Sequence, residues 1–142
     1  MNIFKVISLV PLFLVLLAIY FIVAIAGGSE LFTDAGGTLF TMNLVSGAEW
    51  TLTWSHIFII LGVITLYIEL VKSTSTGTAT VIEHGLSMFT FILYFALFLL
   101  VKPAGNSTFF VLSLMSLLDV VAGFTITIVA ARRDFAVGGP AA

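Results

Sequence analysis

Residues 54–101 read WSHIFIILGVITLYIELVKSTSTGTATVIEHGLSMFTFILYFALFLLV and carry the clearest structural signal in the chain. Two apolar runs, 57–71 and 81–101, are joined by the short polar link 72–80. A helix needs roughly 20 apolar residues to cross a bilayer core, and each run reaches or approaches that length. The segment therefore predicts two antiparallel transmembrane helices, at about 54–71 and 80–101.

The composition of the whole chain agrees with a membrane location. Of the 142 residues, 61% are hydrophobic and 8% are charged, which is far from the usual balance of a soluble domain. The net charge of −2 and the lack of a basic run argue against nucleic-acid binding. The absence of cysteine excludes disulfides and thiolate metal sites.

Two further apolar runs, at about 3–26 and 109–131, predict a first and a fourth span. The small residues that end the first run also fit a signal peptidase site, but the apolar region is too long for a typical signal core. We interpret it as an uncleaved span that Pro11 would bend. The expected fold is one all-α integral membrane domain, 1–142, a four-transmembrane-helix bundle.

The segment at about 38–54 alternates apolar and polar residues around Ser46-Gly47, a pattern that indicates a β-hairpin. An isolated hairpin is marginal in water, so we expect its apolar face to close the outer end of the bundle as a lid. The alternative is a surface that binds a partner. Trp50 and Trp54 would lie at the headgroup level, and His56 would bond within the hairpin.

The basic residues predict the orientation. With the N-terminus inside, four of the five lie on the cytoplasmic side and only Lys102 lies outside. We expect both termini to be cytoplasmic, the hairpin to be extracytoplasmic, and the protein to reside in a bacterial inner (plasma) membrane.

Polar residues in the second, third and fourth spans recur at helical spacing, so each helix has one polar seam. Polar groups in hydrocarbon cost several kcal/mol when unsatisfied, so these seams must face one another or water. The seams are Gly62, Thr65 and Glu69; Glu83, Ser87, Thr90 and Tyr94; and Ser116, Asp119, Gly123 and Thr127.

Asp119 is the most costly of these residues, because it lies near the middle of the fourth span. Three states are open to it. It could be a protonated acid bonded to Thr90, Thr65 or the backbone, a hydrated carboxylate, or the partner of a cation on another chain. It can therefore serve ion or proton transfer, a structural clamp, or subunit docking.

Glu69, Glu83 and His84 form a second candidate group near the cytoplasmic face, where the second span ends and the third begins. A histidine between two carboxylates can bind a metal or move protons. The spacing is not diagnostic of a metal site, so we favour a pairing of Glu69 with Lys72 and a hydrogen bond between His84 and Glu69. His56 and His84 begin antiparallel helices at opposite faces, which excludes a bis-histidine haem within one chain.

These features predict a non-catalytic accessory, scaffold or interaction subunit for other membrane proteins, with no cofactor. Its expected partners are the lipid bilayer and either other membrane protein subunits or further copies of itself. The alternative is a small oligomeric ion- or proton-coupled transporter that uses Asp119. An enzyme is not expected, because no nucleophile has a partnered base.

Overall fold

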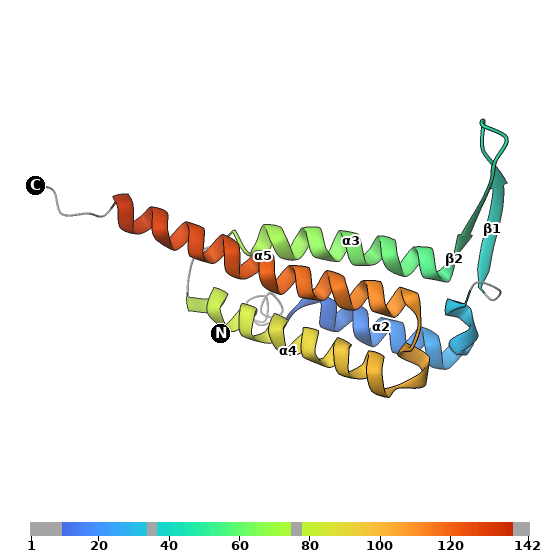
Figure 1. The fold of residues 1–142 in the computed structure, drawn as a ribbon, viewed down its shortest axis with the longest axis horizontal. Coiled ribbons are helices and arrows are strands. Elements are labelled where there is room, and N and C mark those ends of the chain that lie inside the picture. The colour runs from blue at the N-terminus through green and yellow to red at the C-terminus, as the bar shows by residue number, and fades with distance from the viewer. Residues whose placement is uncertain (1–9, 34–36, 75–77, 138–142) are drawn as a thin grey trace, which may run out of the picture.

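A computed structural model describes residues 10–33, 37–74 and 78–137 of the chain. Within these ranges the protein is mostly helical, and its helices form an elongated bundle with a β-hairpin at one end (Figure 1). The α-helices are α2 (Leu12–Gly27), α3 (Trp54–Lys72), α4 (Thr78–Leu100) and α5 (Ser107–Val137). The remaining elements are the 3-10 turns η1 (Ser29–Phe32) and η2 (Lys102–Ala104) and the strands β1 (Thr38–Asn43) and β2 (Glu49–Thr53).

Helices α3, α4 and α5 are each long and apolar enough to cross a membrane. The bounds of α3 and α4 agree with the predicted spans to within about two residues at each end. The predicted fourth span, 109–131, lies within α5, and the helix continues beyond it to Val137. Charged residues do not stop a helix, and no glycine or proline occurs between Arg132 and Val137.

The first helix also begins later than predicted. Pro11 does not bend α2 from within but precedes it in an extended conformation, with φ −62° and ψ 128°. Proline has no backbone N–H and disfavours helical geometry in the residue before it, so it serves well at the start of a helix. The predicted residues 3–9 lie outside the described part of the chain.

The bundle packs α5 against both α3 and α4, and α2 closes it through contacts with the same two helices. Aromatic rings fill much of the core. The Tyr20 ring stacks on Phe32 with centroids 4.4 Å apart and meets Phe58 and Phe109 edge-on. The buried Tyr94 hydroxyl donates a hydrogen bond of 2.9 Å to the backbone oxygen of Phe13 and so joins α4 to α2.

The bundle has an apolar outer surface, and it buries polar groups beside its aromatic core. Polar and charged side chains are buried between the helices, whereas large apolar side chains of every helix are exposed. The apolar outer surface differs from that of a water-soluble bundle, whose outer helix faces are polar. The buried polar residues are Glu69, Ser73, His84, Ser87, Thr90, Thr108, Ser113, Ser116 and Asp119.

The predicted β-hairpin is present, with Phe40 opposite Leu52 and Met42 opposite Trp50. Gly47 turns the chain with a φ of 84°, a conformation that glycine adopts readily. The predicted lid is wrong: the hairpin points away from the helices at the end where α3 begins, and β1 is exposed along its whole length (Figure 1). The start of α2 and the end of α5 lie at the opposite end of the bundle.

Candidate functional site

The predicted seams meet inside the bundle in a group of buried and half-buried side chains that we call the polar cluster. It lies where α3, α4 and α5 pack together, away from the hairpin end. Helical spacing of three and four residues places successive polar groups of each helix on this one face. Its members are Glu69 and Lys72 of α3, His84 and Ser87 of α4, and Asp119 and Thr127 of α5.

Asp119 lies at the centre of the polar cluster and is only 3% exposed. The Ser87 hydroxyl of α4 lies near enough to interact with its carboxyl group. The charged groups of Glu69 and Lys72 are near enough to act on it electrostatically. Neither of the predicted partners, Thr90 and Thr65, forms a hydrogen bond with Asp119. The Thr90 hydroxyl donates to the Leu86 oxygen of its own helix. Thr65 is half-exposed on α3.

Glu69 joins the end of α3 to the start of α2. The Lys72 ammonium nitrogen lies 3.3 Å from its Oε2, which agrees with the predicted pairing. Its Oε1 accepts a hydrogen bond of 2.5 Å from the backbone N–H of Leu12, the first residue of α2. Pro11 offers no side-chain cap, so a carboxylate of α3 satisfies a free amide of α2 and favours its positive end.

Sequence reasoning missed this contact between α3 and α2. The available signal was an apolar helix that follows a proline and contains no capping residue of its own.

His84 is packed tightly between α4 and α5. Its Nε2 lies 2.6 Å from the Thr127 hydroxyl, and that hydroxyl donates to the Gly123 oxygen over 3.0 Å. The hydroxyl has a single proton, so Nε2 of His84 is the donor to Thr127 whenever Thr127 donates to Gly123. The ring lies so close to Gly123 that an added Cβ would be 2.7 Å from Cε1. The predicted bond from His84 to Glu69 is thus replaced by one to Thr127.

The polar cluster has the properties of a satisfied interhelical clamp. Glu83 is half-buried at its edge and acts electrostatically on His84. Among the described residues, no three His, Cys, Asp or Glu side chains lie together in a way that could hold a metal ion. No buried side-chain nitrogen or oxygen in the described part of the chain lacks a hydrogen-bond partner.

Where β2 meets α3, the hairpin is joined to the bundle through a helix cap. The Thr53 hydroxyl accepts from the His56 backbone N–H, and His56 Nδ1 accepts from the Thr53 backbone N–H over 3.2 Å. This reciprocal pair agrees with the predicted hydrogen bonding of His56. The Trp54 side chain packs against the core, and its backbone N–H donates to the backbone oxygen of Gly37, just before β1.

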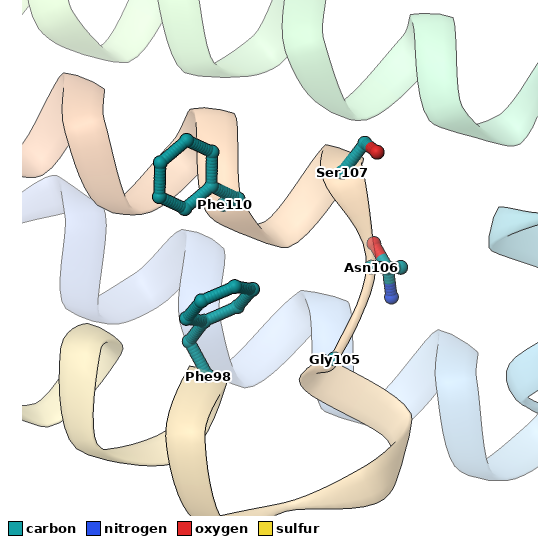
Figure 2. Close-up of a pocket in the computed structure, with 5 residues that line it drawn as sticks. All are labelled: Phe98, Gly105, Asn106, Ser107 and Phe110. Atoms are coloured by element: carbon teal, nitrogen blue, oxygen red, sulfur yellow. The ribbon is translucent and has the colours of Figure 1, made fainter.

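A separate cavity of about 400 Å³ lies where α4 turns into α5 (Figure 2). The rings of Phe98 and Phe110 border it with centroids 5.2 Å apart. The Asn106 side chain is used in structural hydrogen bonds. Its Nδ2 donates to the Tyr20 hydroxyl, and its Oδ1 accepts from the backbone N–H of Phe109. The cavity contains no charged group among its lining residues, so it offers no chemistry of its own.

The two faces of the hairpin differ sharply. One face presents the apolar surface of Phe40, Met42 and Trp50, which are 48%, 46% and 39% exposed. We call it the hairpin apolar face. The other face carries Thr41 and Thr51, whose hydroxyls lie 3.0 Å apart. Phe40 and Trp50 contact each other edge-on across the strands, with centroids 5.9 Å apart.

The polar cluster and the hairpin apolar face are the two candidate functional regions, and both are defined by their geometry alone. Comparison of the chain with protein-family models, with curated proteins and with solved structures finds no match.

Proposed function

We propose that this chain is an integral membrane protein that acts as a non-catalytic interaction subunit, binding another membrane protein through the hairpin apolar face. The membrane assignment is supported by the three long apolar helices and by the apolar outer surface of the bundle. In the orientation that we propose from the basic residues, both termini face the cytoplasm of a bacterial cell and the hairpin lies outside.

The observation that carries the proposal is the exposure of the hairpin apolar face. Two-stranded hairpins are marginally stable alone, and exposed aromatic clusters are typical of protein interfaces. Tryptophan is enriched at the residues that contribute most to binding. The hairpin is also held in place by the bonds of Thr53, His56 and Gly37, so little conformational entropy remains to be lost on docking.

The proposal is tested by photo-crosslinking in native membranes. A photoreactive amino acid replaces Met42 on the hairpin apolar face and, as the matched control, Thr41 on the opposite face. We expect Met42 to yield one dominant protein adduct and Thr41 to yield little. Trp50→Ser, added to the variant with the photoreactive amino acid at position 42, should reduce that adduct strongly, because it removes most of the neighbouring aromatic surface.

Two results would contradict the docking role. Equal yields of adduct from positions 41 and 42 would mean that proteins contact both faces of the hairpin equally. Adducts of Met42 with lipid alone would mean that the hairpin apolar face lies against the headgroups instead. Neither result would bear on whether the bundle spans the membrane.

A second candidate function is proton- or ion-coupled transport through Asp119. The observation in its favour is the grouping of Asp119, Glu69 and Lys72 in one electrostatic network inside the bundle. Against it, the Asp119 carboxyl is almost fully buried and lies near Ser87, which suits a clamp between α4 and α5. Proton flux into liposomes that Asp119→Asn abolishes would favour the transporter.

A further inference from the structure

A continuous groove follows the outer surface between α3 and α5. Two adjoining hollows form it, of about 370 Å³ and 380 Å³, and both are lined by Thr125 and Ile126. The hollow nearer the centre of the bundle is otherwise apolar, with Leu66 of α3 facing Leu118 of α5. We call the two hollows together the α3/α5 groove.

The groove is apolar along its length and cationic at one end. The Thr125 hydroxyl donates to the Val121 oxygen over 2.7 Å, so its hydrogen-bonding capacity is used within α5. The end beyond α3 is lined by Thr74 and Arg133. Thr74 donates to the Val71 oxygen, which leaves the Arg133 guanidinium as the charged donor at this end. No described side chain forms an ion pair with Arg133.

The length of the groove matches one leaflet of a bilayer. Arg133 lies 15 positions after Leu118, which is a rise of about 22 Å along α5. A bilayer with its headgroups is about 40–45 Å thick, so half of it measures about 20–22 Å. If Arg133 lies at headgroup level, Leu118 lies near the midplane.

We propose that the α3/α5 groove binds one anionic phospholipid of the inner leaflet. Its phosphate pairs with Arg133, whose planar guanidinium can form two hydrogen bonds to phosphate oxygens. One acyl chain lies along Ile126 toward Leu118. This inference rests on the membrane placement proposed above, but it does not depend on the docking role of the hairpin.

The test uses the full chain purified in mild detergent and measures lipid retention by native mass spectrometry. Phosphatidylglycerol and phosphatidylcholine of identical acyl chains are added in equal amounts. We expect one phosphatidylglycerol to be retained in preference. Arg133→Gln should lower its retention about fivefold to tenfold, because a lost basic contact near the membrane surface costs about 1 kcal/mol or more.

Matched variants separate a built site from general attraction. Arg132→Gln removes the adjacent charge outside the groove and should change retention less than about twofold. Ile126→Trp fills the groove and should expel the lipid, whereas Ile128→Trp adds the same bulk to an exposed position that does not line it. Circular dichroism identifies any variant that fails to fold, and each pair tests the site independently of the other.

Equal retention of the two lipids by the unmodified chain would overturn the proposal. So would equal losses in the two arginine variants or in the two tryptophan variants. Displacement of the lipid by millimolar inorganic phosphate would reveal a bare anion site in place of a lipid groove and would also overturn it.

Discussion

The Glu69 carboxylate caps a helix that begins 57 residues earlier in the chain, because its Oε1 accepts the backbone N–H of Leu12. The same carboxylate pairs with Lys72 within α3. One buried side chain thus ties the start of α2 to the end of α3. The contact explains how a helix that follows a proline and has no capping residue of its own can begin inside the bundle.

We therefore predict that Glu69→Ala destabilises the protein by about 1–3 kcal/mol, since a buried amide loses its acceptor together with an ion pair. Glu69→Gln should cost less, because an amide oxygen can still accept from Leu12. Unfolding in mixed detergent micelles measures both, and Glu83→Ala is the control at a half-buried position of the same end. Equal stability of the Ala and Gln variants would argue against the cap.

Gly123 and Gly85 make a matched pair of helix glycines. A Cβ at Gly123 would lie 2.7 Å from the His84 ring, whereas one at Gly85 meets nothing within 4 Å. We predict that Gly123→Ala costs about 1–3 kcal/mol, because the ring must move and its bond to Thr127 is disturbed. Gly85→Ala should be neutral or stabilising by up to about 1 kcal/mol. The reverse order of stabilities would show that α4 and α5 do not pack closely here.

The hydroxyl of Tyr94 links α4 to the backbone of α2, and we predict that Tyr94→Phe costs about 1 kcal/mol. Tyr67→Phe is the control, because Tyr67 is exposed on α3. The difference in unfolding midpoint between the two variants isolates the buried hydrogen bond. A midpoint that falls equally in both would deny the bond a role.

The natural absence of cysteine permits a direct test of orientation. Val45→Cys, in the fully exposed turn of the hairpin, should react with an impermeant maleimide on intact cells. Thr74→Cys, in the turn after α3, should react only after the cells are permeabilised. Labelling in the opposite order would invert the proposed topology.

Much of the secondary structure was predictable from local pattern. Apolar runs of transmembrane length located α3 and α4, and the alternation around Ser46-Gly47 located the hairpin. The starts and ends of the other helices were harder. An apolar run marks only the part of α5 that can lie in a membrane, so it does not show that the helix continues to Val137.

Polar partners were only partly predictable. Helical spacing correctly placed Asp119, Ser87 and Glu69 on facing seams, because period alone decides which face a residue occupies. It could not decide which hydroxyl reaches Asp119, since this depends on how far each helix slides along its neighbour. In the structure Ser87 lies near Asp119, while Thr90 bonds to its own helix.

By itself the sequence determined that the chain has long apolar helices, three internal polar seams and an amphipathic hairpin, since composition and period are properties of the local chain. Only the tertiary structure decided that Glu69 caps α2, that His84 bonds to Thr127, and that the hairpin apolar face points away from the bundle. These outcomes depend on how far each helix is shifted along its neighbours and on the angle between the hairpin and α3 at Thr53. Such quantities come from the packing of residues far apart in the chain, which no local pattern contains.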